Sequence, residues 1–291
     1  MSRLCKDALA MSSVTKTNAG GGEIPLRKRY GQHHLTRATI CTPLVDFLDP
    51  TGGWVVEIGP GGGVLTRRLL TAGARVIAVE IDTAWGLFLG QRPEIALANL
   101  VVGDALEIEW GRCPVGTLVT GNLPFNISTV LIERLLPHWG QVPRAAFLVQ
   151  KEVGDRLLAV PGEDAYGALS VLTAARARVA MLGRVGRGSF RPPPKVDGVF
   201  VGLTLVEPVH DEEEMARFTA TVRLSFSQRR KQLRNALTAG WGRQEAVRSL
   251  GVAGIDPRRR AEELSLEEYL RLHEAHRQSA QRAPGRCGPL V

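Results

Sequence analysis

The chain has 291 residues, of which 44% are hydrophobic and 23% charged, with 37 Lys and Arg against 29 Asp and Glu. That length allows one large domain, or a large domain with a small one, and the hydrophobic content is ample for a core. Because no apolar run approaches the roughly 18 residues that a membrane helix needs, we expect no membrane partner. The net charge of +8 favours a polyanionic partner instead.

The spacing of the cysteines and the polar start of the chain indicate in which cellular compartment the protein works. The four cysteines are far apart and form no C-x-x-C pair: Cys5, Cys41, Cys113 and Cys287. This spacing argues against a zinc site or a disulfide framework, so we expect no metal and a reducing, cytoplasmic location. Residues 1–26 have no apolar h-region and are interpreted as a disordered leader rather than a signal peptide, with a transit peptide as the alternative.

Strand and helix patterns then alternate along the chain. A helix is predicted over Ala38–Leu48 and an amphipathic one over Val64–Ala72. Five strands are predicted at Trp54–Ile58, Arg75–Val79, Asn99–Val102, Thr117–Thr120 and Arg144–Val149. The alternation predicts an α/β fold with a parallel sheet covered by helices on both faces. Two more β-rich runs, Arg178–Leu182 and Val199–Val206, could extend the sheet.

A second, helical domain is predicted from the change of pattern near Glu207. Asp211–Glu214 places acid at the start of a helix whose apolar positions recur at helical spacing: Met215, Phe218, Val222 and Phe226. Ser265–Glu268 is a capping box that opens a last helix. We therefore predict a leader (1–26), a catalytic domain (27–206) and a helical domain (207–291) whose tail after Gln278 is frayed.

A glycine-rich turn follows the first predicted strand. The motif consists of Glu57, Gly59, Gly61 and Gly63, at a strand-to-helix turn where a ligand can approach the backbone closely. Dinucleotide binders require G-x-G-x-x-G, whereas the sixth position here is Val64, so the pattern favours S-adenosylmethionine and disfavours a dehydrogenase. Glu80, at the tip of the next strand, can accept both ribose hydroxyls of an adenosine. Asp104, after the third strand, can accept from the adenine amine of that cofactor.

The stretch GNLPFNIS, residues 121–128, follows the fourth strand. The Pro124 ring forbids a continuing ladder, so the chain leaves the sheet at Asn122 and Leu123. An amide, backbone carbonyls and the ring of Phe125 then lie at the carboxyl edge, where open α/β sheets bind ligands. They suit a flat base with an exocyclic amine. A tight turn with a capping Asn and a core Phe is the alternative interpretation.

Taken together, these segments resemble a known family, the ribosomal RNA adenine N6,N6-dimethyltransferases, in its small-subunit branch. The similarity runs from Arg27 to Leu272 and rests on RKRYGQHHL, EIGPGGG, VEID, GDAL, GNLPFNIS, QKEV, YGALSV, FRPPPKV, FSQRRKQLRNAL and IDPRRRAEELS. FSQRRKQLRNAL and the ending favour this branch over the large-subunit enzymes of macrolide resistance. The resemblance implies a Rossmann-like S-adenosylmethionine-dependent methyltransferase sheet with a small C-terminal helical domain. It also implies a monomer that acts on ribosomal RNA of the small subunit, in ribosome biogenesis.

The resemblance carries cofactor contacts over to this chain. They fall on His33, Leu35, Gly59, Gly61, Glu80, Asp104 and Asn122. The family usually reads Gln-Asn-Phe-Leu where this chain reads Gln32-His33-His34-Leu35. A His at position 33 can still donate to or accept from the cofactor's carboxylate end, with a different reach. The family's GNLPFNIS motif often has Tyr where this chain has Phe125, and the loss of that hydroxyl spares the stacking face.

The reaction expected at this edge is transfer of a sulfonium methyl group to adenine N6. Asn122 Oδ1 and a backbone carbonyl near Leu123 or Pro124 can accept the two amine hydrogens and stabilise charge developing on nitrogen. Phe125 completes the catalytic set by stacking on the base. The family implies that Phe190 covers the other face of the base, with a core position as the alternative. Dimethylation itself is implied only by the resemblance.

A basic run in the second domain is expected to contact RNA phosphates. No carboxylate occurs between Met215 and Gln244, and the expected contacts are Arg223, Arg229, Arg230, Lys231 and Arg234. Arg223, Arg230 and Arg234 share a stripe if the helix is continuous, and a merely solvated face is the alternative. Two other functions stay open: large-subunit adenine methylation, and a non-enzymatic nucleic-acid-binding factor on the same fold.

Overall fold

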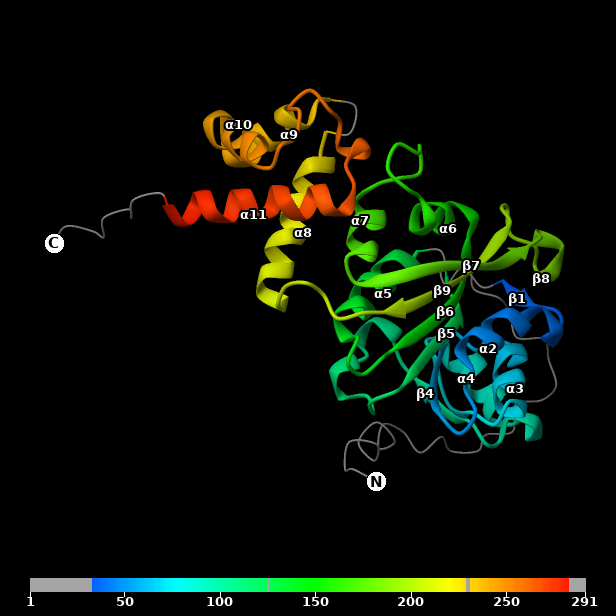
Figure 1. The fold of residues 1–291 in the computed structure, drawn as a ribbon. Helices are drawn as coiled ribbons and strands as arrows, with labels where there is room; N and C mark the ends of the chain where they lie inside the picture. The colour runs from blue at the N-terminus through cyan, green and yellow to red at the C-terminus, as the bar shows by residue number, and fades with distance from the viewer. Residues whose placement is uncertain (1–32, 125, 229–230, 283–291) are drawn as a thin grey trace. The chain divides into compact units, whose positions relative to one another are not determined.

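The computed structural model describes residues 33–124, 126–228 and 231–282, which fall into two compact units (Figure 1). The first unit contains the described residues up to Asp155 together with Arg176–Glu207. The second contains Arg156–Ala175 and the described residues from Pro208 onward.

A seven-stranded sheet forms the centre of the first unit, in the order β4-β3-β2-β5-β6-β9-β7. Its strands are β2 (Trp54–Ile58), β3 (Arg75–Glu80), β4 (Asn99–Val102), β5 (Leu118–Asn122), β6 (Arg144–Gln150), β7 (Ala177–Val185) and β9 (Gly198–Leu205). Strands β2 to β6 pair in parallel, as the alternating pattern predicts. Strand β9 runs antiparallel between β6 and β7, so both late β-rich runs extend the sheet.

The strand order reverses direction between β2 and β5, which fixes where a ligand can bind. β3 and β4 lie on one side of β2, whereas β5 and β6 lie on the other. Gly121 of β5 is paired with Ile58 of β2, and a Cβ at Gly121 would collide with the Ile58 carbonyl oxygen. The two strand ends therefore approach closely at the switch point of the sheet, whose carboxyl edge is the usual ligand crevice.

Helices cover both faces of the sheet, as predicted. They are α2 (Thr42–Leu48), α3 (Val64–Thr71), α4 (Thr83–Gly90), α5 (Ser128–Leu135) and α6 (Lys151–Leu158). Short 3-10 helices of the first unit occupy Ala38–Cys41, Pro93–Ile95, Ala105–Glu107, Trp110–Arg112, Leu136–His138 and Arg187–Ser189. Another 3-10 helix, Ala261–Glu263, belongs to the second unit. On β9, the side chain of Val199 packs against Gly154 of α6, where it leaves no room for a Cβ. Gly202 of β9 packs in the same way against the ring of Phe47 in α2. Because positions an odd number of residues apart point to opposite faces of a strand, α6 and α2 lie on opposite faces.

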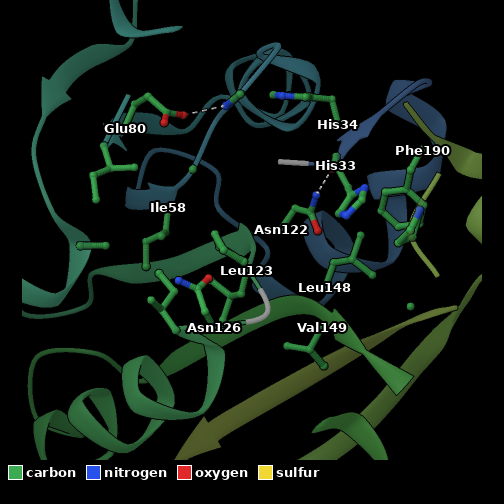
Figure 2. A pocket seen from close by; sticks show the side chains of 18 of the residues that line it. His33, His34, Ile58, Glu80, Asn122, Leu123, Asn126, Leu148, Val149 and Phe190 are labelled. Carbon is green, nitrogen blue, oxygen red and sulfur yellow. Dashed lines mark hydrogen bonds between the residues drawn. The ribbon is translucent and has the colours of Figure 1, made fainter. Parts of the chain in front are cut away.

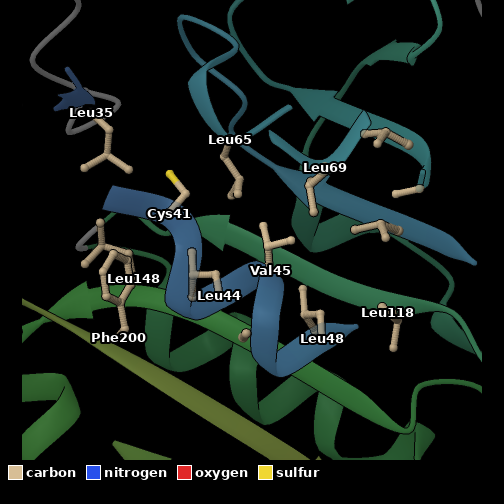
Figure 3. Close-up of a cluster of buried hydrophobic side chains, with 14 of the residues drawn as sticks. Leu35, Cys41, Leu44, Val45, Leu48, Leu65, Leu69, Leu118, Leu148 and Phe200 are labelled. Atoms are coloured by element: carbon tan, nitrogen blue, oxygen red, sulfur yellow. The ribbon is translucent and has the colours of Figure 1, made fainter. Parts of the chain in front are cut away.

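Apolar side chains of α2 and α3 form one core of the first unit (Figure 3). Leu44 and Leu48 of α2 are fully buried and belong to the same cluster as Leu65 and Leu69 of α3. Pro at the first turn of α2 and a left-handed Asp49 at its end confine the helix to these residues. The predicted helix over Ala38–Leu48 is therefore present as a 3-10 turn that continues into α2.

A two-stranded sheet joins the start of the described chain to a late segment. Strand β1 (His34–Leu35) pairs antiparallel with β8 (Phe190–Arg191). His34 is the partner of Arg191, and Leu35 is the partner of Phe190. This pairing brings His34 and Leu35 to the start of the FRPPPKV segment, although more than 150 residues separate them in the chain.

A buried carboxyl group lies within the first core. Glu57 of β2 is only 1% exposed, and its Oε2 has no hydrogen-bond partner among the described residues. Burial raises the pKa of Glu57 to about 8, although hydrogen bonds from Thr66 act in the opposite direction. An ionised carboxylate is costly in such a place, so the protonated form is favoured in the folded chain.

We expect Glu57→Gln to remove part of the pH dependence of stability. The folded chain keeps the Glu57 proton up to about pH 8, whereas the unfolded chain releases it near the ordinary value of 4.5. The stabilisation is therefore complete below the ordinary value and is lost as the pH rises through the folded pKa. Between about pH 5 and about pH 8, the melting temperature of the wild type should fall more than that of Glu57→Gln.

Thermal unfolding of both proteins at a series of pH values checks this. The exposed Glu152→Gln of α6 is the matched control and should follow the wild type. Parallel curves for Glu57→Gln and the wild type would show that Glu57 does not hold a proton in the fold.

The second unit is a helical cluster with its own core. Its helices are α7 (Ala168–Ala174), α8 (Glu212–Phe226), α9 (Leu233–Trp241), α10 (Arg243–Val252) and α11 (Leu266–Arg282). Asp211 caps α8 by accepting from Glu214 N–H, and three glutamates fill its first turn. The capping box before α11 is also present, because Glu268 N–H donates to Ser265 Oγ while Glu268 Oε2 accepts from Ser265 N–H.

Residues 156–175 were predicted to belong to the catalytic domain, but in the structure they group with the helical unit. Val171 and Leu172 of α7 share a buried cluster with Met215 and Phe218 of α8. The Tyr166 hydroxyl donates to the Leu264 carbonyl, 2.8 Å away. These non-local contacts define the unit, and no composition change marks them in the sequence.

The basic segment is not one continuous helix. Helix α8 ends at Phe226, and α9 begins only at Leu233. Between them, Lys231 N–H donates to the Gln228 carbonyl, and Gln232 forms an isolated β-bridge with Arg260. The condition for a single arginine stripe, one continuous helix, is therefore not met. Helix α11 continues past Gln278 to Arg282, so fraying does not begin at Gln278 as expected.

Candidate active site

A cavity of about 290 Å³ lies at the carboxyl edge of the sheet, next to the switch point between β2 and β5 (Figure 2). Residues at the ends of all five parallel strands, β2 to β6, or directly after them contribute to it. Of the predicted site residues, the structure brings together His33, Gly59, Gly61, Glu80, Asp104, Asn122, Leu123, Pro124 and Phe190. The strand-end residues among them, Glu80, Asp104 and Asn122, line the same cavity because the carboxyl ends of parallel strands share one edge.

The glycine turn is shaped by backbone conformations that favour glycine. Gly59, Gly61 and Gly63 all have positive φ, at 64°, 51° and 74°. Gly61 N–H donates to Glu80 Oε2 at 3.2 Å, and Asp82 N–H donates to Glu80 Oε1 at 3.0 Å (Figure 2). Glu80 thus fixes the turn while it lines the cavity, and burial raises its pKa although these two N–H groups act in the opposite direction.

Asp104 is held at the start of a 3-10 turn. Its Oδ1 accepts from Leu106 N–H at 2.8 Å, and the residue lines the cavity beside Gly103. A carboxylate has about four acceptor positions, so this cap leaves capacity for a donor on a ligand.

Asn122 ends β5 with a defined amide orientation. Its Nδ2 donates to the His33 carbonyl at 2.7 Å (Figure 2). Because that carbonyl can only accept, the NH₂ group must face it, and Oδ1 lies on the other side of the amide. Strand β5 ends at Asn122, and the next residue, Leu123, still donates its N–H to the Leu148 carbonyl of β6 before Pro124 interrupts the pairing.

The Pro124 carbonyl of the GNLPFNIS motif already accepts hydrogen bonds within the protein. The Pro124 carbonyl accepts from both Ile127 N–H and Ser128 N–H at 3.2 Å, which closes the turn into α5. The side chain of Leu123 is buried, while the residue lines the cavity. Phe125 was predicted as a stacking residue but lies outside the described residues.

His33 lies in the cavity lining with both its backbone and its ring engaged. Its carbonyl holds Asn122, and its Nδ1 is 2.8 Å from the Pro192 carbonyl. Because a carbonyl only accepts, Nδ1 carries the proton in this contact. The ring is therefore bound to the FRPPPKV segment, while the backbone supports the strand end.

Phe190 and Leu35 both belong to the first core. Phe190 is 5% exposed, which agrees with the alternative interpretation of a core residue. It also lines the cavity, so its ring forms part of the cavity wall. Leu35 packs in the core and is absent from the cavity lining, because its apolar side chain lies beside its partner Phe190. A cofactor contact through the Leu35 side chain is therefore not supported.

Sequence reasoning missed several lining residues. They are His34, Asn126, Pro194, Val196 and Asp197, besides strand-end apolar residues. Asn126 stands inside the GNLPFNIS motif and could have been selected from it. The position of His34 and of the segment around Pro194 depends on the β1–β8 pairing, for which the sequence gives no signal.

The predicted RNA contacts all belong to the second unit. Arg223 lies on α8, Lys231 in the connection and Arg234 on α9, whereas Arg229 and Arg230 lie outside the described residues. Lys231 and Arg234 form no ion pair with a carboxylate in the described part of the chain. By contrast, each arginine in IDPRRRAEELS is paired: Arg258 with Asp256, Arg259 with Glu268 and Glu263, and Arg260 with Glu262.

The donors and acceptors of the cavity fit S-adenosylmethionine. Glu80 and Asp104 offer carboxylate oxygens for the donors of an adenosine, and the positive-φ glycine turn gives close access to backbone. Among the residues that the structure describes, no group of His, Cys, Asp and Glu could hold a metal ion, and no helix is long and apolar enough to cross a membrane.

Known proteins are similar to this sequence over most of its length. A family model described as ribosomal RNA adenine dimethylase matches residues 25–278. A ribosomal RNA small subunit methyltransferase A from Syntrophotalea carbinolica is 41% identical over 252 residues, covering 84% of this chain and 95% of the relative. A protein of the same name from Moorella thermoacetica is 38% identical over 265 residues, covering 85% and 91%.

Solved structures share the fold. A dimethyladenosine transferase from Plasmodium falciparum has a TM-score of 0.69 at 23% identity, covering 85% of this chain and 98% of that chain. A 23S rRNA methyltransferase has a TM-score of 0.64 at 24% identity, covering 84% and 99%. At these identities the likeness shows the fold alone, which confirms the Rossmann-like methyltransferase sheet with a helical domain. With the matched family model and these relatives, the chain belongs to the ribosomal RNA adenine dimethylase family of S-adenosylmethionine-dependent methyltransferases.

Proposed function

We propose that this chain dimethylates N6 of adenines in small-subunit ribosomal RNA, and that Asn122 is its central catalytic residue. The fixed amide of Asn122 at the switch point of the sheet is the observation that carries the assignment of the site. The relatives that are about 40% identical are named small-subunit enzymes, which supports this target over the large subunit. S-adenosylmethionine supplies the methyl group.

The amide orientation suits an amine substrate. Asn122 Nδ2 is committed to the His33 carbonyl, so Oδ1 is the atom left to accept a hydrogen from adenine N6. Positive charge develops on nitrogen during the transfer, and a fixed acceptor dipole stabilises it without reorganising. An Asp at this position could not donate to the His33 carbonyl, which explains why the site uses an amide.

A second acceptor is assigned to the Leu123 carbonyl. The sequence left Leu123 and Pro124 as equal candidates, but the Pro124 carbonyl already accepts two N–H groups in the turn to α5. Leu123 lines the cavity directly after Asn122. Two acceptors on adjacent residues can hold both amine hydrogens and align nitrogen with the methyl group.

The other roles follow from position. Glu80 would bind the ribose hydroxyls and Asp104 the adenine amine of the cofactor, with Gly59, Gly61 and the backbone near Leu35 closing around it. Phe190 would form a wall of the base pocket, and Phe125 would stack on the target base. The target adenine must be unpaired or flipped to reach such a pocket. We further propose that the enzyme works as a cytoplasmic monomer.

Asn122→Ala should lower kcat for methylation about 10²- to 10³-fold, comparable with the removal of one preorganised hydrogen-bonding group from an active site. Binding of S-adenosylhomocysteine, measured by calorimetry, should change far less than turnover. Asn99→Ala is the matched control, since Asn99 is a strand asparagine outside the cavity lining, and it should turn over normally. Turnover of Asn122→Ala close to wild type would refute the catalytic role.

The basic residues without ion pairs are proposed to contact RNA phosphates. Replacing Lys231 and Arg234 together by Ala should weaken RNA binding and reduce the slope of log affinity against log salt by about 0.7–0.9 per lost contact. The measurement is affinity for undermethylated 16S-type ribosomal RNA across a salt series. Replacing Arg258 and Arg260, which are paired with carboxylates, is the control and should leave the slope nearly unchanged. A slope for the Lys231 and Arg234 double variant equal to that of the wild type would remove both residues from the RNA interface.

The target subunit is tested directly with labelled cofactor. We expect label from tritiated S-adenosylmethionine to enter undermethylated 30S subunits, at adenines that are recovered as N6,N6-dimethyladenosine. Label only in 50S subunits would favour the large-subunit alternative. No label with intact cofactor binding would favour a non-enzymatic binding factor.

A further inference from the structure

The side chain of His34 lies against the glycine turn. The family resemblance implies no role for this residue. It lies on β1, paired with Arg191 of β8, and lines the cavity. Gly62 N–H donates to His34 Nδ1 at 3.1 Å. A Cβ at Gly61 would collide with the imidazole, so the ring rests directly on the backbone of the turn (Figure 2).

Helix α4 supports the other side of this imidazole. The rings of His34 and Trp85 are stacked, with centroids 4.4 Å apart and an interplanar angle of 28°. The imidazole is therefore held between Trp85 and the glycine turn, with little freedom to turn away. A planar ring is required for this stack, but a nitrogen acceptor is required for the bond from Gly62.

The bond from Gly62 fixes the tautomer of His34. Nδ1 accepts, so the ring is neutral and its proton is on Nε2. Nε2 is buried and has no partner among the described residues. Protonation would place a second N–H on Nδ1, directly opposite Gly62 N–H, and the hydrogen bond would be lost.

Charged groups around His34 come from each neighbouring element. His33 precedes it on the chain and Arg191 is its strand partner. Glu80 holds the adjacent Gly61 N–H, and Asp82 caps α4. Burial lowers the pKa of His34, and His33 adds to the effect, so the neutral acceptor is the resident form at neutral pH.

We propose that His34 is a positioning residue for the cofactor: its neutral imidazole holds Gly62 N–H and thereby keeps the glycine turn in the conformation that receives S-adenosylmethionine. The Phe that the family usually has at this position can stack on Trp85 but cannot accept from Gly62. Cofactor binding in this chain therefore depends on the protonation of one residue. The inference rests on the placement of the cofactor in this cavity.

The test is the pH profile of S-adenosylhomocysteine binding, measured by calorimetry on the full chain without RNA. Wild-type affinity should be highest at about pH 8 and should fall as the pH drops through the His34 pKa. His34→Phe should bind about three- to tenfold more weakly than wild type at about pH 8, the equivalent of one hydrogen bond. It should also lose less affinity on acidification than the wild type, because the part of the loss that comes from His34 is absent.

A conservative variant separates the hydrogen bond from packing. In His34→Asn, the side-chain Oδ1 occupies a place similar to that of Nδ1 and can accept from Gly62 without titrating. It should recover affinity relative to His34→Phe and should lose less affinity than the wild type as the pH falls through the His34 pKa. His210→Asn, in the second unit, is the control and should keep the wild-type profile.

The inference is overturned if His34→Phe keeps the wild-type pH profile, or if His34→Asn binds no better than His34→Phe. Because the readout is binding alone, it is independent of whether small-subunit RNA is the substrate. A wild-type chain that binds S-adenosylhomocysteine but methylates no RNA would instead contradict the proposed function.

Discussion

The hydrogen bond from Asn122 Nδ2 to the His33 carbonyl is the contact on which the site depends. It connects the end of β5 to a segment 89 residues earlier in the chain. The same contact determines which amide atom faces the cavity and brings the segment that carries His34 to the edge of the sheet. Without it, Asn122 could rotate its amide, and either atom could face a ligand. One backbone acceptor thus gives the Asn122 amide its direction.

Local patterns were sufficient to predict the sheet and the strand-end polar residues that line the cavity. The bounds of β2 and β4 agree with the predicted strands residue for residue. Glu80, Asp104 and Asn122 line one cavity because parallel strands have their carboxyl ends at the same edge of the sheet. The prediction of a parallel sheet was therefore also a prediction that these side chains lie close together. The backbone conformation of the glycine turn is also a local property, because glycines favour the positive φ angles found there.

Non-local contacts account for what the sequence could not predict. The pairing of β1 with β8 spans more than 150 residues and has only two residues on each strand, so no periodicity marks it. That pairing determines the places of His34, Leu35 and Phe190. In the second unit, apolar periodicity identified α8 correctly, but it could not locate the end of the helix. The connection to α9 is defined by the bridge from Gln232 to Arg260, a partner 28 residues away.

The two departures from the family pattern differ in their physical consequence. At position 33, the contact with Asn122 uses the backbone carbonyl, which any residue provides, so a change from Asn to His leaves that contact intact. At position 34, the contacts use the side chain. A His in place of Phe keeps a flat ring for Trp85 and adds a nitrogen that Gly62 N–H can reach. The first substitution is therefore tolerated by the architecture of the strand end, whereas the second adds a titratable group to the glycine turn. Adjacent histidines in the sequence thus belong to different parts of the same site.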